Sequence, residues 1–112
     1  MAYQTVTPLQ LGQAVATTSA ATLYTVPGST RTYLKNIDIV NTSATSASFD
    51  IYLVPSAGTA GVGNALFYQQ TVAAKTNVQW SGLQVLSAGA TIQIKASATT
   101  TFTITASGGE AV

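Results

Sequence analysis

The chain has 112 residues, of which only 6% are charged, and its net charge is +1. A typical soluble domain contains about 25% charged residues, so Ser, Thr, Asn and Gln must keep this surface soluble. The length suits one domain, and the absence of cysteine and histidine excludes disulfides, thiolate chemistry and the usual zinc and iron sites. Two copies with so little charge repel each other weakly, which favours a role in an assembly; an uncharged monomer is the alternative.

The first twenty residues contain Pro8 and Gly12 and show little regular alternation. We therefore expect residues 1–20 to form an extended N-terminal arm. It has no basic segment followed by an apolar one, so no signal peptide is expected, and no apolar run reaches the length of a membrane helix. Because the arm is weakly charged and lacks a core pattern, we expect it to contact a partner. Its candidate partner-binding residues are Tyr3, Val6, Leu9 and Leu11.

From residue 21 onward, Thr, Val, Ile, Tyr and Phe are frequent, and these residues favour strands. In SFDIYLV, residues 49, 51 and 53 are apolar on one face, while Asp50 and Tyr52 take the other. ATIQIKAS and TTFTITA alternate in the same way, which is typical of strands with one buried face. We expect about eight strands, at roughly 10–16, 21–26, 31–41, 47–54, 65–72, 75–80, 83–86 with 90–97, and 100–106.

Turn sequences separate these strands: PGST, NTSATS, PSAGTAGVGN, SG at residues 81–82 and SAGA at 87–90. Short strands at this spacing predict an all-β fold, an antiparallel sandwich or barrel. We place this domain at residues 21–108 and expect residues 109–112 to be a loose C-terminal tail.

Few side chains are suited to chemistry. Asp38 and Asp50 flank one predicted hairpin, and a carboxylate pair is what glycoside hydrolysis requires. The favoured interpretation is that both are solvent-facing strand residues near Lys35 or Arg31. Together with Glu110 they are too few for a calcium site. We expect no enzymatic activity, no cofactor and no metal.

Other binding motifs are equally sparse. GTAGVGN lacks the Lys-Ser/Thr pair of a phosphate-binding loop, and four scattered basic residues do not predict a nucleic-acid surface. We expect no nucleic-acid, membrane or small-molecule partner. Tyr52 is expected to be exposed, opposite the apolar face of its strand, and is the fifth candidate partner-binding residue. It could belong to a sugar-stacking platform, although core or subunit-interface placement of the aromatic residues is favoured.

Several segments follow one another along the chain: LYTVP, an Ile-rich strand ending in Asn41-Thr42-Ser43, IYLVP, and then ALFYQQTVAAKTNVQW and LQVLSAGATIQIKAS. This order resembles that of small virion proteins of tailed bacteriophages and prophages. The resemblance extends from Ala21 to about Gly108 and includes no catalytic signature. It implies a β-sandwich, often jelly-roll-like, that folds in the host cytoplasm and sits on the virion as a dimer or trimer.

These observations predict a capsid decoration, or cement, protein on the outside of a tailed-phage head. Its expected partners are other copies of itself, as a homodimer or homotrimer, and the major capsid protein. A neck, tail or fibre component is one alternative, and a carbohydrate-binding adsorption module is another.

Overall fold

The structure is a computed structural model that describes residues 6–98 and 101–112. Within these residues the chain forms eight strands and one short 3-10 helix, η1. The elements are β1 Val6–Val15, β2 Ala21–Thr25, β3 Arg31–Asn41, β4 Ala47–Val54, η1 Val62–Asn64, β5 Ala65–Val72, β6 Asn77–Leu86, β7 Thr91–Ala96 and β8 Phe102–Ala111.

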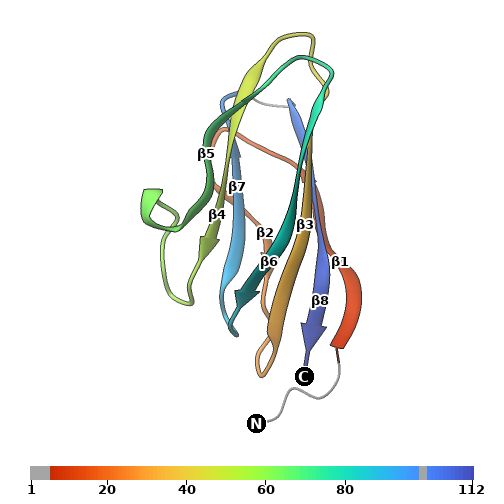
Figure 1. Ribbon diagram of the computed structural model, residues 1–112. Helices are drawn as coiled ribbons and strands as arrows, with labels where there is room; N and C mark the ends of the chain where they lie inside the picture. The colour runs from red at the N-terminus through yellow and green to blue at the C-terminus, as the bar shows by residue number, and fades with distance from the viewer. Residues whose placement is uncertain (1–5, 99–100) are drawn as a thin grey trace.

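The strands form two four-stranded antiparallel sheets, sheet A in the order β1-β8-β3-β6 and sheet B in the order β2-β7-β4-β5 (Figure 1). The first strand pairs with the last, the second with the seventh, the third with the sixth and the fourth with the fifth. The chain is therefore one long hairpin that is wrapped into two layers, which is the jelly-roll arrangement. The predicted all-β sandwich of about eight strands is confirmed.

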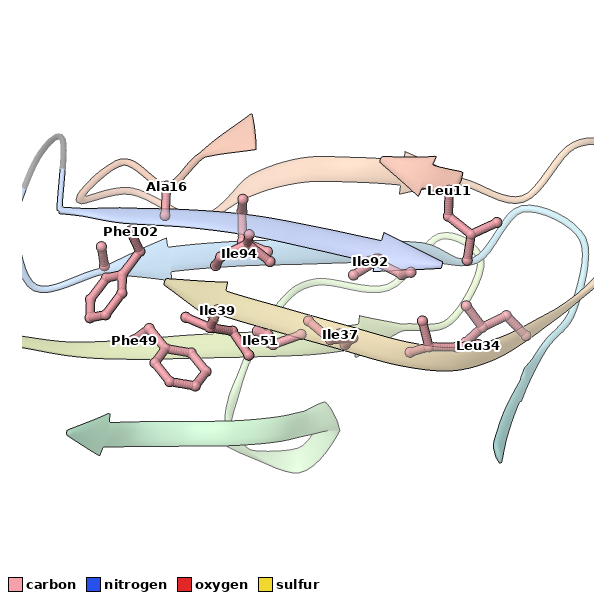
Figure 2. Close-up of a cluster of buried hydrophobic side chains, with 14 of the residues drawn as sticks. Leu11, Ala16, Leu34, Ile37, Ile39, Phe49, Ile51, Ile92, Ile94 and Phe102 are labelled. Carbon is pink, nitrogen blue, oxygen red and sulfur yellow. The ribbon is translucent and has the colours of Figure 1, made fainter. Parts of the chain in front are cut away.

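The core lies between the two sheets and is built from alternate residues of the inner strands (Figure 2). Ile37 and Ile39 of β3, Ile51 of β4 and Ile92 of β7 are all fully or almost fully buried. Near one end, the ring of Phe49 packs 5.1 Å from that of Phe67 and 5.5 Å from that of Phe102, measured between centroids. Because Phe49 and Phe102 come from different sheets, this contact joins the two layers.

A buried asparagine holds the crossing from sheet A to sheet B after β3. The side chain of Asn41 is fully buried, and its Nδ2 donates to the carbonyl oxygens of Thr45 and Val72, both at 3.0 Å. Its Oδ1 accepts from the amide of Ser43 at 2.9 Å and from the hydroxyl of the same residue at 2.8 Å. All the hydrogen-bonding capacity of the amide is thus used.

Residues 6–15 of the expected N-terminal arm instead form β1, a strand of sheet A. Nine residues of β1 pair with β8, with one extra residue, Leu11, between Gln10 and Gly12. This bulge shifts the alternation by one residue, which is why the sequence shows no regular period there. Tyr3 lies outside the described residues.

The expected C-terminal tail is also part of sheet A, because β8 continues to Ala111 and pairs with β1 and β3 along its full length. Gly108 and Gly109 suggested a loose end, but both lie inside this central strand. A Cβ atom on Gly108 would lie 1.9 Å from the carbonyl oxygen of Tyr33, so the glycine permits a close approach of two backbones.

Two further expectations about turns are wrong. Ser81 and Gly82 lie within β6 rather than in a turn, and the register with β3 shifts beside them. Asp38 and Asp50 do not flank a hairpin, because β3 belongs to sheet A and β4 to sheet B. The SAGA turn is present between β6 and β7, with Gly89 at φ 86°.

Candidate interaction surface

Charge is distributed unevenly between inner and edge strands. The two sheets have four edge strands, β1, β6, β2 and β5, and none of them contains a charged residue. Six of the charged residues lie in the inner strands: Arg31, Lys35 and Asp38 in β3, Asp50 in β4, Lys95 in β7 and Glu110 in β8. Charged side chains are a common protection of sheet edges against pairing with other chains. This protein does not use that protection.

The outer face of sheet A carries a shallow apolar hollow of about 390 Å³. Apolar side chains from both edge strands border it, and exposure reaches 56% for Val6 and 55% for Leu83. We call it the sheet-A hollow; its lining residues are Val6, Pro8, Tyr33, Lys35, Leu83, Gly108 and Gly109. Because it brings exposed apolar side chains of two strands together, the hollow is the candidate interaction surface of sheet A.

Backbone irregularities accompany the hollow. The ladders of sheet A shift register at Leu11 in β1 and at Lys35 in β3, on either side of one stretch of β8. Bulges bend a sheet locally. Gly109 of β8 then leaves the floor without a side chain, and a Cβ on it would already lie 3.1 Å from a methyl group of Val6.

A second groove, of about 280 Å³, lies where β4 and β6 end. Leu53 and Val54 line it from sheet B, while Val85 and Leu86 line it from sheet A. The C-terminal half of β6 therefore borders an apolar depression on each side, and Val85 is 49% exposed.

The structure places the predicted partner-binding residues in different environments, some exposed and some buried. Val6 is exposed and lines the sheet-A hollow, so its role stays a prediction. Leu9 is partly buried and packs against the core, and Leu11 is 8% exposed within it. The expectation that these two leucines face a partner does not fit their burial.

The expected exposure of Tyr52 is wrong. Its side chain is only 5% exposed, and its hydroxyl donates to the carboxylate of Asp50 at 2.8 Å. Asp50 also accepts from the backbone amide of Gln69 at 2.6 Å. Burial, followed by the neighbouring carboxylate, raises the pKa of Tyr52 to about 12. Tyr52 therefore presents no ring to a sugar.

Asp50 and Lys95 face each other across β4 and β7 and line a cavity of about 150 Å³. Asp38, in the other sheet, accepts from Nδ2 of Asn77 at 3.1 Å. The two carboxylates therefore do not form the pair that the hairpin would have produced. Among the residues that the structure describes, no three acidic, cysteine or histidine side chains gather as a metal site would require.

A polar cluster links the sheets near the chain's C-terminal end. The hydroxyl of Tyr24, in β2, donates to Glu110 of β8 and is 2.7 Å from the hydroxyl of Thr32, in β3. Burial, followed by the hydrogen bond to Glu110, raises the pKa of Tyr24 to about 12. Glu110, which was expected in a loose tail, thus ties the edge of sheet B to the middle of sheet A.

Sequence reasoning missed most of the sheet-A hollow. Tyr33 and Leu83 form its walls, and Val85 lies beside it. In LQVL the apolar residues at 83 and 85 share one face, which is the signal that could have found them. It was hidden because the apolar core residue Leu86 follows directly.

No protein-family model matches the chain, and no curated protein is significantly similar to it. A solved structure, that of the infectious bursal disease virus Gx strain, contains a chain with 19% sequence identity and a TM-score of 0.34. The match covers 97% of this chain and 28% of that one, and at this TM-score it carries no argument. No helix in the described residues is long and apolar enough to span a membrane. The resemblance to tailed-phage virion proteins stays a prediction.

Proposed function

We propose that the protein is a non-enzymatic structural component of a virus particle, a decoration protein that docks on the outside of a tailed-phage head. The sheet-A hollow is the docking surface, and the partner is an apolar projection of the major capsid protein. The observation that supports this most strongly is an apolar hollow on the outer face of a jelly roll whose edge strands are free of charge.

The shape of the site suits docking better than catalysis. Its walls are apolar side chains and its floor is glycine backbone, with Lys35 as the one charged side chain among the lining residues. An apolar projection that fills it would displace water from Val6 and Leu83, which are each more than half exposed. Each contact would be weak, but copies that are joined to one another would bind a lattice more strongly, because the first contact raises the effective concentration for the next.

Docking can be tested with purified protein and heads of the phage that encodes it, prepared from a mutant that lacks the gene. We expect the protein to co-sediment with these heads, and we expect the amount bound to saturate as the protein concentration rises. Val6→Lys should weaken binding by about 10-fold or more, because it places a charge in an apolar contact. Val15→Lys is the matched control, since Val15 is 50% exposed at the other end of the same strand.

The outcomes separate the alternatives. Absence of binding at about 100 μM protein, or equal losses from the two lysine variants, would overturn the proposal. Immunogold labelling of intact virions would then show whether the protein belongs to the neck, tail or fibre. Binding to immobilised glycans, with loss on Tyr33→Ala, would instead support an adsorption module.

A further inference from the structure

The four edge strands are not equally open to pairing. β1 contains Pro8 and a bulge, and β2 is only five residues long and has a register shift of its own. β5 has two register shifts and a positive φ of 52° at Gln69. Proline, bulges and short length all hinder the addition of another strand. Each of these three edges therefore combines at least two features that hinder pairing.

β6 has only one such feature, a single register shift. It has ten residues without proline or charge, and it pairs on one side only, with β3 (Figure 1). Its one register shift with β3 lies beside Gly82 and Leu83. Leu83 is 55% exposed and Val85 is 49% exposed. A long, uncharged and partly apolar edge of this kind is a template for an added strand.

We propose that β6 pairs antiparallel with β6 of a second copy of the chain, around a two-fold axis beside Leu83. Sheet A then continues into the partner as one eight-stranded sheet. A two-fold contact is self-complementary by symmetry, because each copy supplies the same strand. The two Leu83 side chains lie next to each other on the outer face, and the unpaired backbone groups of both edges become satisfied.

The size of the contact fits a weak dimer. Pairing over residues 80–86 spans about 24 Å along the strand. Even if the contact extended across the smallest extent of the whole molecule, 18 Å, this strip would amount to no more than about 400 Å² on each copy. A standard interface buries about 800 Å² on each partner, so the isolated pair should be transient. The second copy is nevertheless the favoured occupant, because a net charge of +1 gives two copies little mutual repulsion.

The nearest charges act weakly on this arrangement. Lys35 lies one strand behind Leu83, so the two Lys35 side chains are about 14 Å apart in the dimer, three strand spacings. This exceeds the screening length of about 8 Å at physiological salt. Added salt should therefore strengthen the dimer slightly rather than weaken it.

The first test is the solution mass over a range of concentrations, by sedimentation equilibrium without any capsid. We expect the mass to rise from 11.4 kDa toward twice that value. Leu83→Lys should raise the dimer dissociation constant about 10-fold or more, while Val15→Lys, on the other edge of sheet A, should leave it unchanged. Mixing Leu83→Lys with Leu83→Glu should restore a heterodimer, because the opposite charges then meet across the axis.

A second readout uses the absence of cysteine from the sequence. Leu83→Cys should form a disulfide-linked dimer on mild oxidation, since opposed residues in antiparallel strands lie within disulfide range, and Val15→Cys should not. A mass of 11.4 kDa up to about 1 mM, or equal crosslinking of the two cysteine variants, would overturn the inference. Because no capsid is present, the result is independent of the proposed docking.

Discussion

Replacement of Gly108 by alanine tests the close approach of β8 and β3. Gly108 pairs with Leu34 in the middle of sheet A, beside the register shift at Lys35. The added Cβ would lie 1.9 Å from the carbonyl oxygen of Tyr33 and 3.0 Å from its carbonyl carbon. Side-chain rotation cannot relieve this clash, because the atoms it meets belong to the backbone.

The loss of stability follows from the distance that the two strands must move apart. Contacts between carbon and oxygen below 3.0 Å are essentially absent from proteins, so the two strands must separate by more than 1 Å. Overpacking costs about 1–3 kcal/mol, and each backbone hydrogen bond lost from the ladder costs about 0.5–1.5 kcal/mol more. With one or two such bonds affected, we expect Gly108→Ala to lower the free energy of unfolding by about 1.5–6 kcal/mol.

Urea unfolding, followed by the fluorescence of the single tryptophan, measures this loss. Trp80 packs against the core from β6, so its emission reports on sheet A. Gly28→Ala is the control, because no atom lies within 4 Å of the added Cβ there and its φ is not in the left-handed region. We expect the control to change stability by less than about 1 kcal/mol. A loss at Gly108 that is no larger than the control's would refute the described approach of the two strands.

Two other predictions concern buried polar groups. Asn41→Ala should lower the free energy of unfolding by about 2–4 kcal/mol in the same urea experiment, because the carbonyl oxygens of Thr45 and Val72 lose their donor. A loss below about 1 kcal/mol, the contribution of one ordinary hydrogen bond, would contradict this. The pKa values of Tyr24 and Tyr52 are raised from the ordinary tyrosine value of 10 to about 12. The folded state therefore holds these two protons more tightly than the unfolded state does. Their contribution is complete below pH 10 and is lost as the pH rises through about 12. Urea titrations at increasing pH should show this decline, with a smaller slope for Tyr24→Phe; a stability that does not change between about pH 10 and pH 12 would contradict it.

Period-two alternation predicted the inner strands well because each of them buries one complete face. β4 and β7 were expected at roughly 47–54 and 90–97 and occur at Ala47–Val54 and Thr91–Ala96. β4 still misled on one point, since its second face is buried too: Asp50 and Tyr52 are 7% and 5% exposed. Alternation shows which residues share a face, but it does not show whether another segment covers the polar one.

The sequence was least informative where the backbone departs from regular pairing. Leu11 is an extra residue in β1, and it turned a strand of sheet A into an apparently irregular arm. Gly108 and Gly109 suggested a flexible end, although the glycines are needed for close contacts with β3 and β1. In both places the reason for the residue is its partner strand, which lies about 75 to 100 positions away in the sequence and leaves no local signal.

The jelly-roll pairing also explains why the candidate surface could not be assembled from the sequence. Val6, Tyr33, Leu83 and Gly109 come from four strands that are far apart in the chain and meet only because the first strand pairs with the last and the third with the sixth. The same pairing fixes which strands become edges. An outermost strand such as β6 has one partner only, so its free side must be protected or used. Three edges of this protein combine two or more protective features, among them proline, bulges and short length, and the fourth has a single register shift beside Gly82. An edge that is left open in a chain with so few charges is the feature that a self-assembling protein needs and that a monomer would be expected to avoid.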